Sequence, residues 1–523
     1  MTPAPSPHVE EPGIYLVGAG SFARKLAVIL RKFGMGFSVV DEVAKGQFEG
    51  AVVYSSTSLP SPHGLFLIAI SMPEYAQAAI ARLVAAGVPE TRCLPLGSDS
   101  AAIVLEQMLA EDKMRALKLL AEPLTDFVDF ERRFFAEAYQ CLDARRDGSA
   151  VIGLYALGRG GGYIEHLGAL PQSLQNHYQL NWFTDLLTDK SNEAFFLMSQ
   201  SAMQRYSDVD LVISAHVFDC SPRQTPKLSF VHMVYDFLLF SDQTYQHLQA
   251  SDLHYVFVPS LASMKMHQNI CRELNLNEQV VLIPGGYPKH DANLRQYKAL
   301  YENAVPEDLI IYAPTLSSLP AKNECDESYS ILEAEVFLKE LLATHPQLKL
   351  IIRPHPEDMA LVQFSLAHPR AEALRRILHW AAGHPRCEID DDKRSYLASF
   401  SRAKLLITDT ASVAFSFALL TGRRPVFFSG NHQTLCERYP DNQFITDRPY
   451  FGDCVESAAE LNERVELALN NKMNTSAGQA FFQRTLYNLG RSEEYALEAI
   501  RYILAGERHP DWWYWQDHRR ESE

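Results

Sequence analysis

In the stretch LLITDTASVAF, residues 405–415, a short apolar strand is expected to run directly into the start of a helix. Asp409, Thr410 and Ser412 follow the strand, and residues of these types often cap helices. Hydroxyl groups and free N–H groups at a helix start also suit a phosphate. Plain capping by Asp409 or Thr410 is the structural alternative, and it is compatible with phosphate binding. The stretch therefore predicts a strand–helix unit with a phosphate site at its turn.

A second motif, KLIIRPHP at 349–356, also follows a predicted strand. Arg353 and His355 leave this buried strand together, and cationic donors at such a place suit a diphosphate. A loop stiffened by Pro354 and Pro356 is the structural alternative. Further strands of the same unit are expected at 309–313, 405–408 and 425–428.

The preceding unit carries LSFVHMVYD at 228–236, in which His232 stands at the carboxyl end of a predicted strand. The neutral-range pKa of histidine suits it to take a proton from an alcohol, although a lone histidine is more often structural. Between the two units lies IPGGYPKHD at 283–291, whose glycines suit a hinge or a close ligand approach. Strands of this unit are expected at 150–154, 210–214, 228–232 and 254–259.

The N-terminal segment contains Gly18-x-Gly20-x-x-Ala23 between a predicted strand at 14–17 and a helix that runs to Arg31. Glycines permit the tight turn and let a phosphate approach backbone N–H groups. Asp41, at the end of the second strand, could hold a ribose hydroxyl. A small α/β domain that keeps the turn and binds nothing is the alternative.

Strands that alternate with amphipathic helices predict an α/β protein with parallel sheets. Two successive units joined at the Gly-Gly-Tyr-Pro turn suggest two Rossmann-like halves that face each other across a cleft, after a small Rossmann-like N-terminal domain. The expected divisions are an N-terminal domain at 1–100, a helical connector packed on the next unit at 101–146, halves at 147–285 and 286–508, and a tail at 509–523. The tail holds 3 of the 5 tryptophans and is predicted to be a packing strap, with a partner patch as the alternative.

The composition excludes several classes. A net charge of −16 argues against nucleic acid as a partner, because neutralising phosphates needs a basic surface. The 8 cysteines show no zinc-type spacing, so we expect reduced thiols and no metal. No signal peptide and no uninterrupted apolar run long enough for a membrane helix is evident. We expect a cytoplasmic protein, and we leave open a peripheral association with the inner face of the cytoplasmic membrane and homo-oligomerisation.

In their order along the chain, these motifs resemble those of the CDP-glycerol glycerophosphotransferase family, which makes teichoic acid and related capsule polymers. The matching segments are FVH at 230–232, GYPKHD at 286–291, YAPT at 312–315, RPHP at 353–356 and TDTASV at 408–413. The N-terminal stretches LVGAGSFARKLAVIL at 16–30 and LFLIAISMPEYAQAAIARLVAAGV at 65–88 resemble the N-terminal domain of bacterial sugar acetyltransferases that bind UDP-sugars. Two departures stand out, since Met233 replaces the family's glycine and Leu316-Ser-Ser replaces its Trp-Arg.

The resemblance implies a GT-B-like fold and a metal-independent, inverting transferase that needs no cofactor. His232 would be the catalytic base, and His355 would contact the donor phosphates. The other residues that it implies for the donor nucleotide are Arg353, Thr410, Ser412, Asp409, Thr315, Gly286, Tyr287 and Asp291. The donor would be CDP-linked or another nucleotide diphosphate, and the acceptor a glycan or polyol-phosphate polymer.

Two alternatives remain beside this interpretation. A nucleotide-sugar epimerase also uses two facing Rossmann-like halves, and it would form an epimer without an acceptor. A non-catalytic nucleotide-binding scaffold of an envelope assembly complex would bind a nucleotide without turnover. An NAD-dependent dehydrogenase is disfavoured, because no hydride-transfer partner domain is evident.

Overall fold

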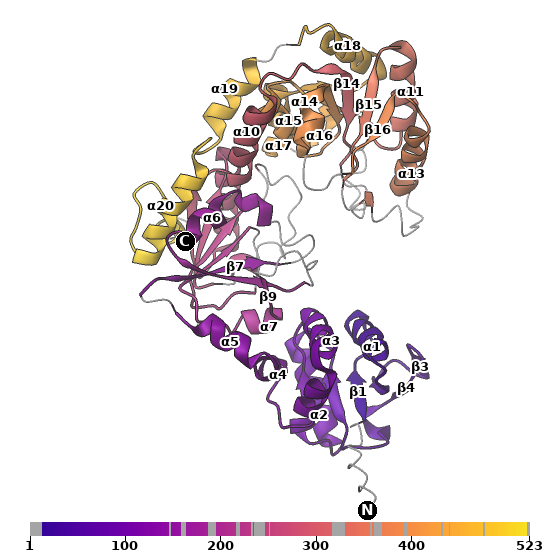
Figure 1. Ribbon diagram of the computed structural model, residues 1–523, viewed down its shortest axis with the longest axis vertical. Coiled ribbons are helices and arrows are strands. Elements are labelled where there is room, and N and C mark those ends of the chain that lie inside the picture. Colours follow the sequence, from indigo (N-terminus) through magenta and orange to yellow (C-terminus); the bar gives the residue numbers. More distant parts are fainter. Residues whose placement is uncertain are drawn as a thin grey trace, which may run out of the picture.

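Three open sheets flanked by helices follow one another along the longest axis of the molecule, which we analysed as a computed structural model (Figure 1). The structure describes residues 13–145, 148–157, 164–186, 195–215, 220–231, 234, 246–249, 251–315, 330–355, 358–359, 369–391, 396–429, 432–438, 440–473 and 476–519. The strands expected from the sequence are confirmed in all three sheets, and their ends lie within about two residues of the expected bounds.

The first domain holds a six-stranded sheet of order β3-β4-β2-β1-β5-β6. Its strands are β1 (Ile14–Val17), β2 (Phe37–Val40), β3 (Gln47–Phe48), β4 (Ala51–Tyr54), β5 (Leu65–Ile68) and β6 (Cys93–Pro95). All pairs are parallel except β3 with β4. Helices α1 (Ser21–Lys32) and α2 (Pro73–Ala85) connect them.

The helical connector differs from the expectation in two ways. It is broken into α3 (Ser100–Leu120), α4 (Phe127–Phe134) and α5 (Ala136–Asp143), and α3 is itself kinked at Asp112. The apolar face of α3 packs into the core of the first domain, together with α1, so this helix completes that domain instead of packing on the next one. Only α4 and α5 reach the core of the middle domain.

The middle domain has an eight-stranded sheet of order β20-β13-β12-β11-β10-β7-β8-β9. Its strands are β7 (Val151–Ala156), β8 (Gln179–Thr184), β9 (Phe195–Leu197), β10 (Leu211–Ser214), β11 (Lys227–Phe230), β12 (Leu253–Val258), β13 (Gln279–Pro284) and β20 (Trp513–Tyr514). Its described helices are η3 (Ile164–Leu167), α6 (Leu170–Gln175), α7 (Gln200–Met203), η4 (Gln246–Gln249) and α9 (Leu261–Leu274).

The third domain follows the long helix α10 (Pro288–Tyr301) and has a parallel six-stranded sheet of order β16-β15-β14-β17-β18-β19. Its strands are β14 (Glu307–Tyr312), β15 (Lys349–Ile352), β16 (Cys387–Ile389), β17 (Ala403–Thr408), β18 (Val426–Phe428) and β19 (Asp453–Val455). The helices described are α11 (Ala334–Thr344), α13 (Pro369–Ala382), α14 (Leu397–Arg402), α15 (Val413–Thr421), α16 (His432–Arg438), α17 (Gln443–Phe451) and α18 (Ala458–Leu469).

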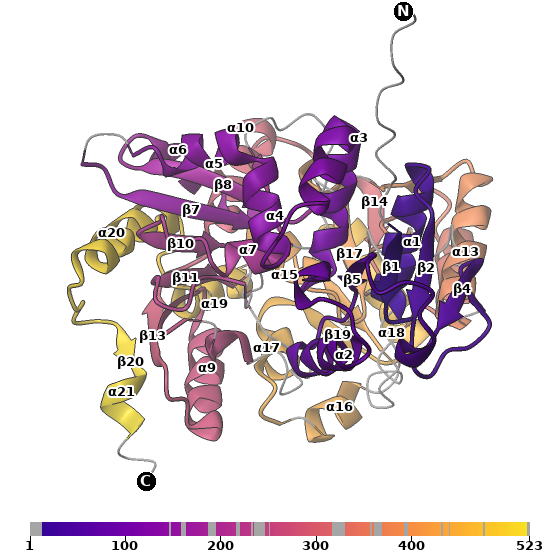
Figure 2. The same ribbon diagram turned by 90° about the horizontal axis from the view of Figure 1, so that it is seen from below.

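The chain then returns to the middle domain through α19 (Ser476–Thr485) and α20 (Ser492–Ala505), which run along one side of the molecule (Figure 1). Seen from below, α20 lies beside the middle sheet, near α6 (Figure 2). Its apolar residues join the middle core, so the expected boundary at 508 is wrong for this helix, which belongs to the middle domain. With this return the middle and third domains form the expected GT-B-like pair of Rossmann-like halves.

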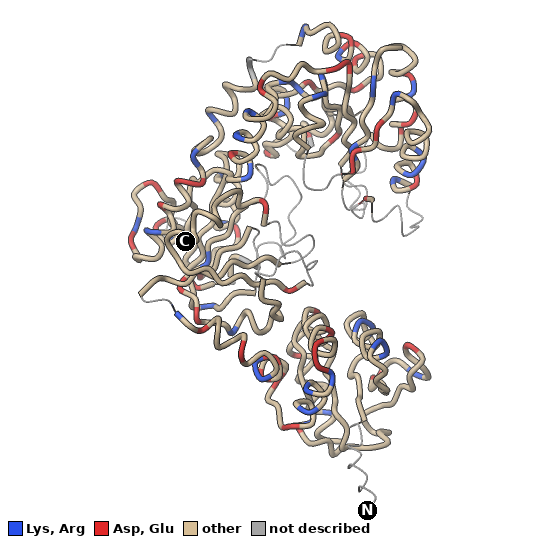
Figure 3. Tube along the Cα trace, in the orientation of Figure 1, with Lys and Arg blue, Asp and Glu red and all other residues tan. Residues whose placement is uncertain are grey.

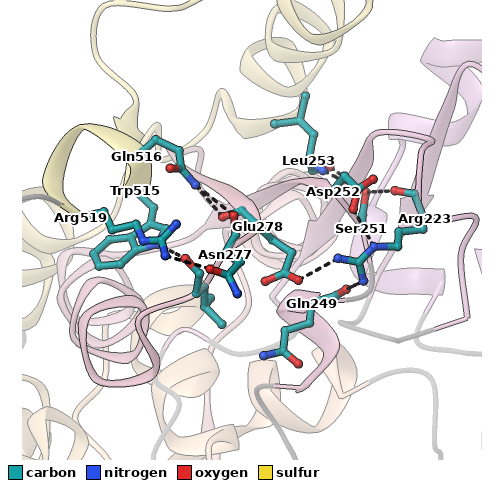
Figure 4. Close-up of polar contacts among 11 residues, drawn as sticks. Arg223, Gln249, Ser251, Asp252, Leu253, Asn277, Glu278, Trp515, Gln516 and Arg519 are labelled. Carbon is teal, nitrogen blue, oxygen red and sulfur yellow. Dashed lines mark hydrogen bonds and ion pairs between the residues drawn. The ribbon is translucent and has the colours of Figure 1, made fainter.

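The tryptophan-rich tail is a packing strap, as predicted. β20 pairs antiparallel with β13 at the sheet edge, and α21 (Trp515–His518) follows it. Trp515 is fully buried, and its indole N–H donates to the carbonyl of Leu276 at 2.9 Å. Gln516 and Arg519 hold the same corner through Asn277 (Figure 4). Each of the three domains carries both signs of charge along its trace (Figure 3).

Candidate functional site

The third sheet has the strand order 3-2-1-4-5-6, counted from its own first strand, and such a sheet binds ligands where the order reverses. That switch point lies between β14 and β17, which pair in parallel with Tyr312 opposite Ile407. Thr315 follows β14 and Asp409 follows β17, so two of the predicted site segments meet here. The third predicted segment, 353–355, follows β15 on the other side of β14.

Asp409 ties these segments together from inside the domain. Its side chain is fully buried, and Oδ1 accepts from the N–H groups of Thr315 at 2.9 Å and Thr410 at 2.6 Å. Oδ2 accepts from the N–H group of Ser330 at 3.1 Å. Burial raises the pKa of Asp409, while the N–H donors act against that shift. The expected role as a nucleotide ligand is therefore corrected, because both oxygens face the protein backbone.

The turn from Asp409 into α15 presents hydroxyl groups to the outside. Thr408 is buried, and its hydroxyl donates to the carbonyl of Ala313 at 2.6 Å. Thr410 is half-buried and Ser412 exposed. Within the part of the chain that the structure describes, Ser412 makes no side-chain cap bond to α15. Phosphate binding by Thr410 and Ser412 at the start of α15 stays a prediction.

Arg353 and His355 lie at the same edge of the sheet. The backbone N–H of Arg353 donates to Tyr312 at 2.9 Å, which fixes the segment to β14. The Arg353 guanidinium donates to Asp390 at 2.6 Å and lies over the ring of Tyr396, with its carbon 5.7 Å from the ring centroid. His355 is half-buried, and its carbonyl accepts from Asp358. Arg353 is thus ion-paired and only slightly exposed, and His355 follows it two residues later in the chain.

The GGYPKHD segment packs against the returning chain. Gly286 has a φ of +102°, and a Cβ there would lie 2.6 Å from the carbonyl oxygen of Tyr487. Asp291 is buried, and its carboxylate accepts from the N–H groups of Gly490 and Ser492, each at 2.7 Å. These contacts anchor the start of α20. Asp291 is therefore corrected from a donor-binding residue to the residue that holds the returning helix.

Tyr287 belongs to a polar cluster at the junction of the two halves that the sequence did not predict. Its hydroxyl contacts Nδ1 of His166 in η3, and Nζ of Lys289 lies 3.4 Å from Nε2 of the same histidine. Glu165 approaches Lys289 at 3.6 Å. Burial lowers the pKa of Lys289, and Glu165 opposes that shift. The sequence signal that could have found this cluster is the glycine-rich run 158–162, which follows β7 and precedes η3.

His232 lies outside the described residues, so its place relative to these groups stays a prediction. The neighbouring Phe230 ends β11, and Val231 after it is buried. In the parallel middle sheet the carboxyl end of β11 is the edge at which a cleft residue would be expected.

The glycine turn of the first domain has the predicted local structure. Gly18 has a φ of +103°, and a Cβ there would touch Ile70 at 3.3 Å, while Ala23 is buried. A Cβ on Gly20, the residue before α1, would meet nothing within 4 Å. Oδ1 of Asp41 accepts from Val43 and Ala44 within its own loop, each at 2.8 Å. Ligand binding by this turn stays a prediction.

The described residues show neither a metal-binding cluster nor a membrane-spanning helix. They contain no group of three or more His, Cys, Asp or Glu side chains placed to hold a metal ion. None of the described helices combines the length and apolar character needed to cross a membrane.

Comparison with known proteins found similarity only at the level of solved structures. No model of a protein family and no curated protein matches the chain. The wall teichoic acid polymerase TagF is 14% identical, with 78% of this chain and 97% of that chain covered at a TM-score of 0.46. A glycosyltransferase from Rickettsia africae is 13% identical, covers 68% and 99%, and has a TM-score of 0.40. MurG from Acinetobacter baumannii is 14% identical, covers 64% and 98%, and has a TM-score of 0.33.

Because all three TM-scores lie below 0.5, the function proposed next rests on the chain's own residues.

Proposed function

We propose that this protein is a transferase that moves a glycerol-phosphate-like or glycosyl group from a nucleotide-diphosphate donor to a hydroxyl of a glycan or polyol-phosphate polymer. One observation carries the proposal. Asp409 joins the end of β14 to the start of α15 at the switch point of the third sheet, where Thr410 is half-buried and Ser412, which precedes the helix, is exposed. Free N–H groups and hydroxyls at a switch point suit the phosphates of a nucleotide.

In this proposal the diphosphate lies at the start of α15. Thr410, Ser412 and the N–H group of Val413 bind its oxygens, while His355, which follows β15 on the other side of β14, reaches it from the side. These groups would stabilise the negative charge that grows on the leaving nucleotide. Arg353, whose guanidinium is paired with Asp390, would add a positive charge beside the donor phosphates.

The reaction that we propose has one bond-forming step. An acceptor hydroxyl oxygen attacks either the phosphorus of the transferred polyol phosphate or the anomeric carbon of a sugar. The bond from that atom to the nucleotide breaks, and the hydroxyl proton passes to His232. Orienting the two substrates would supply much of the rate. We propose that no metal ion takes part, so that EDTA should leave turnover unchanged.

The experiment follows nucleotide release from CDP-glycerol, CDP-ribitol and common nucleotide sugars in the presence of a glycan acceptor. We expect His355→Ala to lower turnover by about 100-fold or more, as does the removal of other groups that stabilise a developing charge. His379→Ala is the matched control, because His379 is exposed on α13 of the same domain, and it should keep full turnover.

Three outcomes would contradict the proposal. Full turnover in both His232→Ala and His355→Ala would contradict the proposed mechanism. Formation of an epimer without any acceptor would instead indicate an epimerase. Tight nucleotide binding with no turnover of any donor would indicate a non-catalytic scaffold.

A further inference from the structure

Arg448, in α17, is a buried charge without a hydrogen-bonding partner among the described residues. Its side chain is fully buried, and Nε, Nη1 and Nη2 have no hydrogen-bond acceptor among the residues that the structure describes. The guanidinium is instead enclosed by two aromatic rings, with its carbon 4.9 Å from the centroid of Phe427 and 4.6 Å from that of Phe444. Ring faces stabilise a cation in part, but they do not replace the lost hydrogen bonds to water.

Three other arginines of the third domain show how a covered guanidinium is normally satisfied. Arg353 pairs with Asp390, Arg424 pairs with Asp453 at 2.8 Å, and Arg423 donates to the hydroxyl of Tyr297 at 2.9 Å. Arg448 is the most buried of the four and makes none of these bonds. A buried charge that stays unpaired lowers stability, so its presence points to a role outside the folding of the chain.

The position of Arg448 indicates what that role is. Phe427, which the guanidinium covers, lies on β18 directly opposite Thr408 of β17. The residue after Thr408 is Asp409, whose carboxylate fixes the turn into α15. The positive charge therefore lies beneath the carboxyl ends of β17 and β18, under the turn that we propose for the donor diphosphate.

The neighbouring groups offset this charge only in part, because burial lowers the pKa of Arg448 to about 10 although Cys454 and Asp409 act against that shift. Asp409 already accepts from three backbone N–H groups. His432 has a buried Nδ1 without an acceptor among the described residues, and burial and Arg448 together lower its pKa. Because charges in a protein interior are screened less than in water, Arg448 acts on the turn that Asp409 fixes, and Asp409 is among the groups that interact with its charge.

We propose that Arg448 is a positioning residue of the donor site, whose buried charge acts through the Asp409–Thr410 turn on the diphosphate of a bound nucleotide without touching it. The inference rests on the proposed function and adds to it. It implies that the site selects its ligands by negative charge, with nucleoside diphosphates favoured over monophosphates. It also implies that Arg448 strengthens donor binding while it weakens the ligand-free fold.

The test measures two quantities, the affinity for CDP and CMP by calorimetry and the unfolding midpoint without ligand. In Arg448→Met, which replaces the cation by an apolar side chain of similar length, we expect CDP affinity to fall about tenfold and CMP affinity to fall less. The ligand-free midpoint should stay equal or rise, since an unpaired buried charge is removed. Arg448→Lys should lower CDP affinity as well, because burial without an acceptor favours the neutral amine of lysine.

Arg424→Met is the matched control, because it removes a cation of the same domain that already has a carboxylate partner. It should lower the midpoint without changing the preference for CDP over CMP. The inference is overturned if Arg448→Met keeps its CDP affinity, if it loses CDP and CMP affinity equally, or if it fails to fold. A wild-type protein that binds no nucleoside diphosphate would overturn the proposed function as well.

Discussion

The carboxyl edges of the first and the third sheets carry the same kinds of residue but use them differently. In the first domain the carboxylate of Asp41 accepts from Val43 and Ala44, two and three residues away. In the third domain Asp409 accepts from Thr315 and Ser330, 94 and 79 residues away. One aspartate shapes a single loop, whereas the other fastens three separate segments into one surface.

This difference indicates which sheet edge is better preorganised to bind a ligand. A ligand gains affinity when the groups that hold it are already fixed, because less freedom is lost on binding. The third edge is fixed by long-range bonds between segments, and the first depends on the conformation of individual turns. Changes at Asp409 should therefore affect both stability and nucleotide binding, and equivalent changes in the first domain should affect little beyond their own loop.

The largest effect is expected for Asp409→Asn. The asparagine oxygen can still accept from one side, but its NH₂ group would face the N–H of Ser330, which leaves buried donors unpaired. The cost should be about 3 kcal/mol, since bonds to a buried charged acceptor are lost. Urea unfolding followed by circular dichroism gives the cost, and hydrogen exchange of the 403–421 segment should locate it. An unchanged midpoint together with unchanged CDP affinity would show that the long-range bonds of Asp409 are dispensable.

The second-largest effect is expected at Glu131, which connects the first domain to the middle domain. Glu131 of α4 is fully buried, and Oε1 accepts from the N–H of Ser199, at the start of α7 in the middle domain, at 3.1 Å. Oε2 has no partner among the described residues. Burial raises the pKa of Glu131 to about 7. At pH values below the ordinary pKa of a carboxyl group, Glu131 is protonated in both the folded and the unfolded state. As the pH rises towards 7, the unfolded state loses this proton first, so the free energy of unfolding falls.

Glu131→Gln removes that penalty because the side chain stays neutral. We expect the variant to unfold at the same point as the wild type at pH 4.5, and to be more stable by up to about 3 kcal/mol at pH 8.5, where the penalty is complete. Unfolding midpoints across that pH range measure the difference. A constant difference at all pH values would mean that Glu131 stays protonated or stays charged throughout. Asp409 joins segments within the third domain, whereas Glu131 joins two domains, and the cost of the Glu131 contact depends on pH.

The sequence predicted the strands and their polar ends well, because the apolar runs before Arg353 and Asp409 are short and are followed directly by polar residues. The sequence did not predict which residues form hydrogen bonds with them. Nothing local tells that Asp291 accepts from Gly490, about 200 residues later, or that Asp409 points inward while Ser412 points outward. Arg448 was missed for the same reason, since an arginine before a proline in a helix gives no sign of burial.

A smaller effect separates the two helix starts. Ser412→Ala removes a hydroxyl from the proposed phosphate site, and we expect CDP affinity to fall about fivefold, or about 1 kcal/mol, as for one hydrogen bond. Ser21→Ala makes the same change at the start of α1 in the first domain, and there CDP affinity should not change. Calorimetric titration of both variants with CDP provides the comparison. Equal losses in the two variants would place part of the CDP binding in the first domain.

The smallest effect is expected for Asp41→Asn. Its Oδ1 accepts both loop bonds, and the amide oxygen of asparagine can do the same, so the stability should change by less than about 0.5 kcal/mol. Urea unfolding under the conditions used for Asp409→Asn makes the two numbers comparable. A nucleotide held by the first domain through the second oxygen of Asp41 would give a different result, because the substitution turns that acceptor into a donor. UDP-linked sugars would then stabilise the wild-type protein but not Asp41→Asn, while the two proteins would be equally stable without ligand. That result would show that the carboxyl edge of the first sheet binds a ligand of its own.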